Sequence, residues 1–381
     1  MIFSDPRFLA LFAVCWLAFV AVPARGRSAV LALTGLAFYA WYAGWFVVIV
    51  LGLTAAAVIS DRRWQLFMCG AAIVLVLAWF KIPALSSRLS PASAVLIPLG
   101  ISYLSFELLH VVIERRRGRL TEVGFIDLMA FIFFMPCRMA GPIRRFPDFT
   151  SAVQAAGPSI EDIYEGVVRI LVGFAKKLIV ADTLGLTVAE MPAVSTPAHA
   201  WTVVLAFGFH ILFDFSAYSD LAIGFARLFG IRVPENFNYP YLAVNIRDFW
   251  NRWHITLSHW VRDYVFVPSS RALFGTLLRP YPMAIAVCSY LLTFLVVGVW
   301  HGVTLAFAAW GLYHGTLLAL HHIIQARMPV AVAASAWYRS WIGHALGCAI
   351  TFFFVTLGWV PFMTDLDHAR VLLRLMLLGA D

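Results

Sequence analysis

The stretch PYPMAIAVCSYLLTFLVVGVWHGVTLAFAAWGLYHGTLLALHHIIQA, from Pro280 to Ala326, contains no Asp, Glu, Lys or Arg over 47 positions. A helix needs about 20 apolar residues to cross a bilayer, so this stretch is long enough for two spans. A second uncharged stretch, Ser28 to Ser60, covers 33 positions. Of the 381 residues, 62% are hydrophobic and 13% are charged, whereas a soluble domain carries about 25% charged residues. We therefore predict an all-α polytopic membrane protein.

Apolar runs between charges predict about eleven transmembrane or re-entrant helices in one domain, residues 1–381. We expect them near residues 8–24, 29–59, 64–80, 92–113, 125–140, 164–181, 198–213, 215–230, 282–300, 303–325 and 341–362. The run at 29–59 fits either one long helix or two short ones. We find no internal repeat of the kind that marks the two halves of many transporters.

The chain is basic, with a net charge of +8 and a pI of 9.4, but its basic residues lie in short clusters between apolar runs. These clusters are Arg25 with Arg27, Arg62 with Arg63, and Arg115 to Arg117 with Arg119. Such clusters are typical of cytoplasmic loops and headgroup contacts. We therefore expect a lipid bilayer as the partner and no nucleic acid. The five cysteines have no metal-ligand spacing, and we expect no metal site.

The segment from Leu228 to Arg279 is too polar to span a membrane and unusually rich in aromatic residues. Within it, Ile246 to Tyr264 has a helical pattern, because one set of residues recurs at spacings of three and four. This set is Trp250, Trp253, His254, Leu257 and Val261. We predict one amphipathic helix that lies in or against the membrane interface.

His301 interrupts the long uncharged stretch and is a functional candidate for that reason alone. An ionisable group at membrane depth is costly, so it normally faces the interior of a helix bundle or a wet cavity. The alternative is a buried histidine that bonds a carbonyl group within the bundle. We expect His314, further along the same stretch, to be structural or to support the site.

Four segments resemble the membrane-bound O-acyltransferase family, in the bacterial branch that includes the alginate O-acetylase and the teichoic-acid D-alanyl transfer protein. They are NFNYPY at Asn236–Tyr241, DFWNRWHITLSHWVRDY at Asp248–Tyr264, WHG at Trp300–Gly302 and WGLYHG at Trp310–Gly315. The recognisable core runs from about residue 96 to 322. The chain has Ser269, Ser270 and Arg271 where alginate-type sequences usually continue with Gly-Gly-Asn.

The resemblance implies two catalytic histidines. His301 is the expected general base on an acceptor hydroxyl, since a neutral imidazole with a pKa near about 6.5 suits this task. His254 is expected to be the second histidine of the family's signature. It polarises the acyl carbonyl, orients the hydroxyl, or holds its helix against the core.

Further residues are expected to bind substrate: Asp214, Tyr218, Trp250, Arg252, Trp253, Trp300, Arg262 and Asp263. Asp214 and Tyr218 are four residues apart and share a helix face. Asp214 binds acceptor or orients a histidine, or it forms a buried ion pair with Arg252 or Arg247. Arg252, Arg262 and Asp263 anchor donor phosphates, or they contact lipid headgroups.

The expected reaction moves an acyl group, preferably acetyl, from a cytoplasmic thioester to a hydroxyl of an exported polysaccharide or envelope glycan. The thioester donor is acetyl-CoA or an acyl carrier protein, and no bound cofactor is expected. The resemblance places the enzyme in the bacterial cytoplasmic (inner) membrane, with a periplasmic partner that finishes the transfer. D-alanyl transfer to a teichoic-acid-like polymer is the nearest alternative. A proton-coupled transporter, using the buried Asp and His residues as a relay, and a scaffold that recruits a partner are alternatives from other classes.

Overall fold

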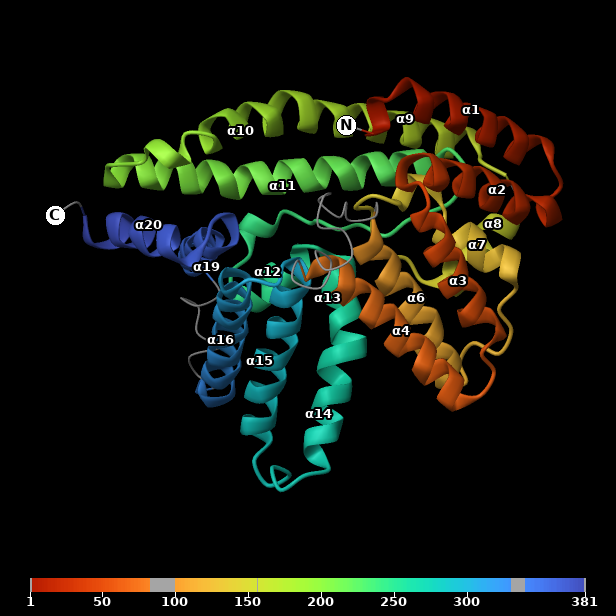
Figure 1. Cartoon of the computed structure of the whole chain (residues 1–381). Helices are drawn as coiled ribbons and strands as arrows, with labels where there is room; N and C mark the ends of the chain where they lie inside the picture. Colours follow the sequence, from red (N-terminus) through yellow and green to blue (C-terminus); the bar gives the residue numbers. More distant parts are fainter. Residues whose placement is uncertain (1, 83–99, 156, 330–339, 380–381) are drawn as a thin grey trace, which may run out of the picture. The chain divides into compact units, whose positions relative to one another are not determined.

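The computed structural model describes residues 2–82, 100–155, 157–329 and 340–379 (Figure 1). Every regular element within these ranges is helical, which confirms the all-α prediction. The chain divides into two compact units that are described separately here. Unit 1 comprises Met1–Ala175 and Ala217–Pro234, and unit 2 comprises Lys176–Ser216 and Glu235–Asp381. Helix α11 contributes residues to both units.

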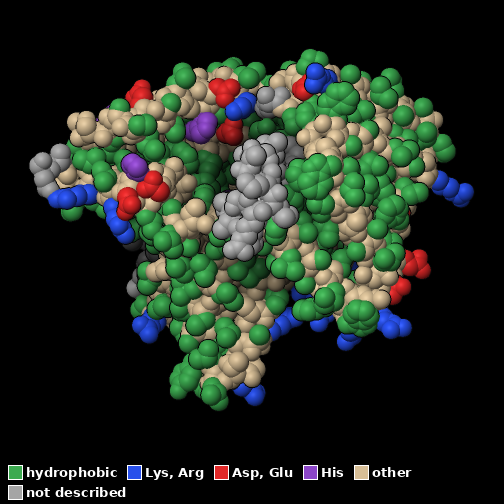
Figure 2. Space-filling view, in the orientation of Figure 1, with side chains coloured by type: hydrophobic (Ala, Val, Ile, Leu, Met, Phe, Trp, Pro, Cys, Tyr) green, Lys and Arg blue, Asp and Glu red, His purple; other side chains and the backbone are tan. Residues whose placement is uncertain are grey.

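Among the described residues, four helices are long and apolar enough to cross a membrane. They are α4 (Arg63–Lys81), α11 (Pro197–Arg227), α15 (Pro282–His301) and α19 (Trp341–Met363). The apolar helices α1 (Pro6–Ala21) and α3 (Phe46–Ile59) are shorter. Apolar side chains also cover much of the surface seen in Figure 2. These features fit a chain that meets lipid over wide areas.

Three of the predicted spans differ from the structure. The runs at 198–213 and 215–230 form the single helix α11, because the charge of Asp214 is matched by Lys177 at 2.7 Å and does not end the helix. The run at 125–140 holds only the eight-residue α7 (Phe125–Ile132) and a 3₁₀ turn containing Pro136, so it is too short to span. The run at 92–113 lies partly outside the described residues. The run at 29–59 forms two helices, which was one of the two options.

Unit 1 is built from helices whose apolar faces meet in a core rich in phenylalanine. Its helices are α1, α2 (Ala24–Ala43), α3, α4, α6 (Ile101–Arg116), α7, α8 (Phe146–Gln154), α9 (Ile160–Ala175) and the end of α11. Phe12 of α1 packs against Phe225 of α11 with ring centroids 4.8 Å apart. Buried Glu107 accepts hydrogen bonds from Arg138 and Arg144, so a carboxylate balances part of this buried charge.

Unit 2 contains the remaining helices and both expected catalytic histidines. Its elements are the π-helix η3 (Lys176–Ala181), α10 (Asp182–Val188), most of α11, α12 (Ile246–Arg252), α13 (Ile255–Val261), the π-helix η6 (Arg262–Phe266), α14 (Val267–Phe274), α15, α16 (Leu305–Arg327), α19 and α20 (Leu366–Leu378). Helices α14, α15 and α16 run side by side (Figure 1).

Helices α15 and α16 pack backbone to backbone through glycines. A Cβ atom on Gly298 would lie 2.3 Å from the carbonyl oxygen of Phe307, and one on Gly311 would lie 2.2 Å from that of Phe294. Small residues permit this close approach of two apolar helices. The short turn between them places His301, the last residue of α15, beside the first turns of α16.

The predicted amphipathic helix at Ile246–Tyr264 is not continuous. Helix α12 ends at Arg252, and α13 begins at Ile255. At the break, His254 has φ 42° and ψ 54°, a left-handed conformation that no continuing helix allows. Trp250 and Trp253 are buried within unit 2. The tryptophan face is therefore packed within the protein, and the prediction of one continuous helix was wrong, whereas its position against the membrane interface stays a prediction.

Candidate active site

His301 lies at the end of α15 within a cluster of aromatic rings. Its ring centroid is 4.6 Å from that of Trp300, 5.2 Å from that of Trp310 and 5.0 Å from that of Phe362. The side chain is only half-buried, whereas His254 and His314 are fully buried. Of these three histidines, His301 is therefore the most accessible.

His254 occupies the break between α12 and α13, where its backbone is held by a fixed set of partners. Its Nδ1 lies 3.3 Å from the side-chain oxygen of buried Asn236, which also accepts a hydrogen bond from the Thr256 hydroxyl at 2.7 Å. The backbone N–H of Ile255 donates to the Asn236 carbonyl at 2.9 Å. An amide oxygen only accepts hydrogen bonds, so the proton of neutral His254 sits on Nδ1 and the lone pair on Nε2.

The two histidines are near enough to influence each other electrostatically. Burial lowers the pKa of His254 well below its ordinary value of 6.5, and a positive charge on His301 lowers it further. His254 is therefore neutral near pH 7. A site with one fully buried neutral imidazole and one accessible imidazole offers two different roles in proton transfer.

Trp310 links His301 and His314, because its ring contacts both. The ring of Trp310 contacts His314 at 5.1 Å, and that of Trp250 contacts His314 at 5.3 Å. Several buried polar atoms of this region have no hydrogen-bond partner within the described part of the chain: the indole nitrogens of Trp250 and Trp310, both ring nitrogens of His314 and the Thr293 hydroxyl. Buried polar groups are normally satisfied, so this cluster is built to meet water or substrate atoms.

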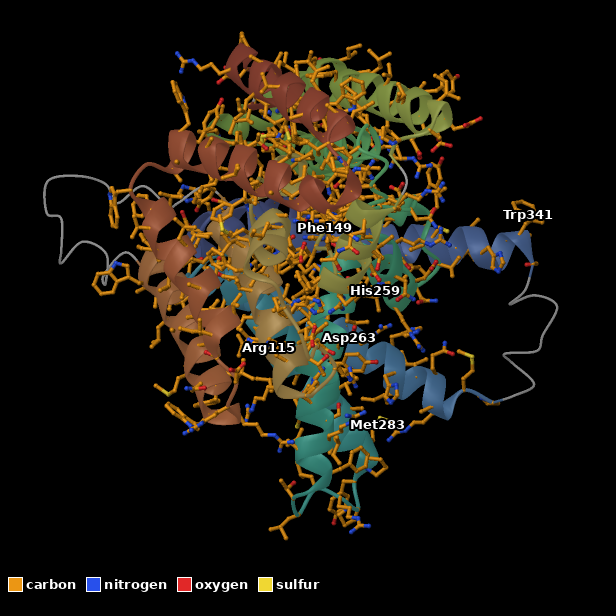
Figure 3. The ribbon with its side chains drawn as sticks, turned by 90° about the vertical axis from the view of Figure 1, so that its right-hand side faces the viewer. Arg115, Phe149, His259, Asp263, Met283 and Trp341 are labelled. Carbon is orange, nitrogen blue, oxygen red and sulfur yellow. The ribbon has the colours of Figure 1, made fainter. Side chains whose placement is uncertain are left out.

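A first cavity, here called the basic pocket, has a volume of about 260 Å³ and is lined in part by Trp250, whose ring contacts His314. Its cationic or ionisable lining residues are Arg247, His259 and Arg262. Trp250 and Thr293, which carry two of the buried polar atoms just described, line it as well. Figure 3 shows His259 and Asp263 following each other along α13 and η6. The basic pocket combines positive charge, hydrogen-bonding groups and an apolar wall.

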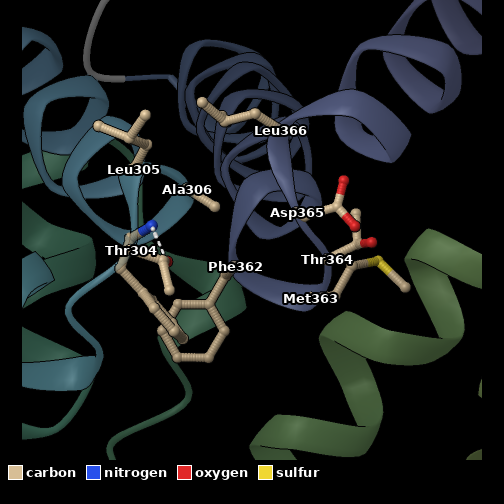
Figure 4. A pocket seen from close by; sticks show the side chains of 9 residues that line it. Thr304, Leu305, Ala306, Phe362, Met363, Thr364, Asp365 and Leu366 are labelled. Atoms are coloured by element: carbon tan, nitrogen blue, oxygen red, sulfur yellow. Dashed lines mark hydrogen bonds between the residues drawn. The ribbon is translucent and has the colours of Figure 1, made fainter. Parts of the chain in front are cut away.

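A second cavity, here called the aromatic pocket, has a volume of about 490 Å³ (Figure 4). It is lined by the first turn of α16, the end of α19 and the start of α20: Thr304, Leu305, Ala306, Phe307, Phe362, Met363, Thr364, Asp365 and Leu366. Phe307 and Phe362 also contact the His301 ring, at 6.3 and 5.0 Å. The ring of His301 thus contacts two residues of the aromatic pocket's wall.

The other expected binding residues are distributed unevenly. Asp214 pairs with Lys177, not with Arg252 or Arg247, and Arg252 pairs with Asp248 at 2.8 Å. Of the expected arginines, Arg262 lines the basic pocket, and it also pairs with Asp263 at 3.0 Å. Trp253 packs against Trp359 and lines neither cavity. Tyr218 belongs to unit 1, where its ring lies 5.7 Å from that of Phe3.

Sequence reasoning did not assign a site role to several residues that line the cavities or hold the histidines. Asn236 was part of a quoted motif, and its buried amide beside His254 appears only in the fold. Arg247 and His259 give no signal beyond their charge in a polar segment. Phe307 and Phe362 are apolar residues in apolar helices, and periodicity cannot distinguish them from other core residues.

A model of the membrane-bound O-acyltransferase family matches residues 33–359. The chain belongs to this family. It is 32% identical to a probable alginate O-acetylase of Pseudomonas aeruginosa over 393 residues, covering 96% of this chain and 72% of the relative. It is also 33% identical to a teichoic acid D-alanyltransferase of Bacillus subtilis, with 77% of each chain covered. A peptidoglycan O-acetyltransferase of Helicobacter pylori is 33% identical over 66% of this chain and 46% of the relative.

Family membership makes the protein a membrane-bound O-acyltransferase with several membrane-spanning helices. The prediction of the family from its quoted segments is therefore confirmed. An O-acyltransferase needs a base for the acceptor hydroxyl and space for two substrates. Unit 2 contains the half-buried His301 and both cavities.

Proposed function

We propose that the enzyme transfers an acetyl group from a cytoplasmic thioester to a hydroxyl of an exported or cell-envelope polysaccharide, with His301 as general base. The observation that carries this proposal is the position of His301, which is half-buried and whose ring contacts Phe307 and Phe362 in the wall of the aromatic pocket. A base that two separate substrates approach from different directions permits direct transfer without a covalent acyl-enzyme.

In the proposed step, the acceptor oxygen attacks the carbonyl carbon of the thioester while His301 takes the hydroxyl proton. The carbon–sulfur bond then breaks, and the protonated imidazole returns the proton to the leaving sulfur. The surrounding rings of Trp300, Trp310 and Phe362 exclude bulk water, which strengthens these interactions. His254 presents its Nε2 from a fixed orientation, and we assign it the role of orienting the hydroxyl or the carbonyl.

The basic pocket is the proposed site of the donor. Acetyl-CoA and the prosthetic arm of an acyl carrier protein both carry phosphate, amide groups and an apolar thioester end. Arg247 and Arg262 supply positive charge for phosphate, and Trp250 and Thr293 supply buried polar atoms for amide groups. Within the described part of the chain, no ion pair is found for Arg247, so its charge remains available to a ligand.

The same pocket favours acetyl over D-alanyl. A D-alanyl group carries an ammonium ion, which needs a carboxylate or several carbonyl groups when it leaves water. The described residues that line the basic pocket include two arginines and no Asp or Glu. An ammonium group there would meet like charge. D-alanyl transfer remains the second candidate because a relative with that name matches 77% of the chain.

The polysaccharide acceptor and the bacterial inner membrane are the finer parts of the proposal. The names of the relatives include alginate, teichoic acid and peptidoglycan, which are all polymers of the bacterial envelope or exterior. The chain has Ser269, Ser270 and Arg271 where alginate-type sequences usually have Gly-Gly-Asn. This difference argues against alginate as the specific acceptor. As the family resemblance implies, a separate periplasmic protein completes the transfer to the polymer.

The decisive experiment compares base-released acyl groups from the envelope glycans of three strains: wild type, His301→Ala and a deletion. We expect acetate in the wild type and a loss to the level of the deletion in His301→Ala, with equal amounts of protein in the membrane. His344→Ala, an exposed histidine on α19 away from both cavities, serves as the control and should retain acetate. Equal acetate in wild type and His301→Ala would exclude this mechanism, and lost D-alanine would identify the second candidate.

A further inference from the structure

Unit 1 holds a cluster of charged side chains that the proposed reaction does not use. Arg138 and Arg144 converge on the carboxylate of Glu107. The Nη1 of Arg138 donates to one of its oxygens at 3.2 Å, and the Nη2 of Arg144 donates to the other at 2.8 Å. The side chains of Arg138, Arg144 and Glu107 are 0%, 4% and 2% exposed. Bulk water therefore does not solvate these charges, and the protein itself has to stabilise them.

The cluster carries an excess of positive charge. Two guanidinium groups meet one carboxylate, and in the part of the chain that the structure describes no other acidic group pairs with Arg138 or Arg144. The Arg144 guanidinium also lies 4.7–5.0 Å from the centroids of three rings, those of Phe131, Phe134 and Phe149. Ring faces attract a cation but add no negative charge. One positive charge of the cluster therefore has no counter-charge among these groups.

Several hydrogen-bond donors of the cluster also lack an acceptor. The Nη1 of Arg138 donates to the Ile132 carbonyl as well, and the Nη2 of Arg144 donates to the Phe131 carbonyl at 2.5 Å. The Nε and Nη2 of Arg138 and the Nη1 of Arg144 have no hydrogen-bond partner among the described residues. The same holds for the buried hydroxyl of Tyr39, which is near enough to Arg138 for an electrostatic interaction. Guanidinium groups only donate, so an anion beside them would accept these bonds and balance the charge at once.

The backbone around Arg138 is packed closely. Gly100 has φ 65°, and a Cβ atom there would lie 2.0 Å from the carbonyl oxygen of Arg138. A Cβ atom on Gly141 would lie 2.6 Å from the Cα atom of Cys137. Both glycines thus allow neighbouring backbone to approach the cluster. An enclosure of this kind favours a single-atom anion over the phosphate of a lipid or a nucleotide.

We propose that Arg138, Arg144 and Tyr39 bind one small monovalent inorganic anion, such as chloride, inside unit 1. The anion accepts hydrogen bonds from the two guanidinium groups and from the phenol, and it balances the positive charge that Glu107 leaves. It stabilises the folded protein, because an uncompensated buried charge is costly. These residues belong to unit 1, whereas His301 belongs to unit 2. The inference goes beyond the proposed function and does not depend on it.

The test uses the purified full-length protein in detergent. Sodium gluconate is replaced stepwise by sodium chloride at constant ionic strength, and thermal unfolding is followed by tryptophan fluorescence. A ligand that binds only the folded state raises the unfolding temperature with its concentration. For the wild type we expect a rise of at least about 3 °C when chloride replaces gluconate. Radiolabelled chloride should also remain with the protein on gel filtration in a one-to-one ratio.

Tyr39→Phe tests the site with the least disturbance, because it removes only the hydroxyl group. The chloride concentration that gives half of the maximal stabilisation should rise at least about fivefold, since one hydrogen bond to the anion is lost. Tyr42→Phe is the matched control. Tyr42 lies on the same helix, α2, and its hydroxyl already donates to Asp5 at 2.5 Å. The chloride response of this control should equal that of the wild type.

Two further variants change the charge of the cluster in opposite directions. Arg138→Gln removes the excess charge, so its unfolding temperature should no longer respond to chloride. Glu107→Gln adds to the excess and should bind chloride at least about tenfold more tightly. Arg169→Gln is the control for both, because Arg169 pairs with Asp220 at 2.5 Å and its charge is balanced. If Arg138→Gln does not fold, the variants at Glu107 and Tyr39 decide the question.

Equal unfolding temperatures of the wild type in gluconate and chloride, with no retained label, would overturn the anion site. A chloride response that is identical in the wild type, Tyr39→Phe and Glu107→Gln would overturn it as well, because the ion would then act elsewhere. His301→Ala should keep the full chloride response while acyl transfer is lost. Failure of this inference and failure of the proposed function are therefore distinguishable.

Discussion

Asn236 is a residue that holds the imidazole of His254 through one of its ring nitrogens. Its side-chain oxygen faces the Nδ1 of His254 and the hydroxyl of Thr256, and its backbone carbonyl accepts the N–H of Ile255. A neutral imidazole has two tautomers, and the partner of one nitrogen decides which lone pair is available. Asn236 is thus a positioning residue that acts through His254.

Asn236→Ala should lower the rate of acyl transfer by about a hundredfold, because His254 loses the partner that fixes its tautomer. The double variant Asn236→Ala/His254→Ala should be no slower than His254→Ala, since the two residues act as one unit. Asn238→Ala is the control, because Asn238 is exposed in the same segment. Additive losses in the double variant would show that Asn236 acts independently of His254.

Arg247 tests the assignment of the donor to the basic pocket. Removal of a charge-assisted contact with phosphate costs about 1.5–3 kcal/mol, which corresponds to about a tenfold or greater rise in the KM for acetyl-CoA. Since this contact is made equally before and during the reaction, kcat should not change. We therefore expect Arg247→Ala to affect donor KM alone in steady-state assays of the purified enzyme.

Arg252→Ala provides the comparison for Arg247→Ala. The guanidinium of Arg252 pairs with Asp248, and Arg252 lines neither cavity. The KM of the Arg252→Ala enzyme for acetyl-CoA should therefore stay near the wild-type value. An unchanged KM in Arg247→Ala, or a larger rise in Arg252→Ala, would place the donor elsewhere.

At the scale of elements, the pair of helices α15 and α16 is the frame of the site. The pair carries His301, Phe307, Trp310 and His314, and its backbones approach through Gly298 and Gly311. A close approach of this kind leaves no room for a methyl group. The distance between the two helices therefore sets the positions of the rings around His301.

Gly298→Ala should destabilise the protein by about 1–3 kcal/mol and reduce transfer, because the new Cβ meets the Phe307 carbonyl and forces the helices apart. Thermal unfolding in detergent, followed by tryptophan fluorescence, measures the change. Gly52→Ala on α3 is the matched control, since nothing lies within 4 Å of its Cβ position. Equal unfolding temperatures for the two variants would contradict the close packing of α15 and α16.

At the scale of the whole molecule, the match to the family runs through both units. It covers residues 33–359, whereas the two histidines and both cavities belong to unit 2. Unit 1 contains buried charges of its own, with Glu107 between Arg138 and Arg144. The prediction of a single domain stays a prediction, because α11 contributes to both units.

The amino-acid sequence was sufficient for the class of fold and the family, and it singled out two histidines whose catalytic role stays a prediction. Composition and long uncharged runs reflect the low polarity of lipid, which acts on every residue in the same way and needs no knowledge of contacts. His301 stands out because an ionisable side chain in such a run is costly. The segments around His254 and His301 are local in sequence, and their resemblance to the family was visible for that reason.

The tertiary structure decided the break at His254, the continuity of α11 and the two cavities. Hydrophobic periodicity does not reveal a residue in the left-handed conformation, such as His254. The charge of Asp214 suggested a helix boundary, but the helix continues because Lys177 pairs with this carboxylate. Phe307 and Phe362 are far apart in the chain and meet at His301 through the packing of α16 against α19. Cavities arise from contacts between distant segments, and such contacts depend on packing that no single stretch of sequence encodes.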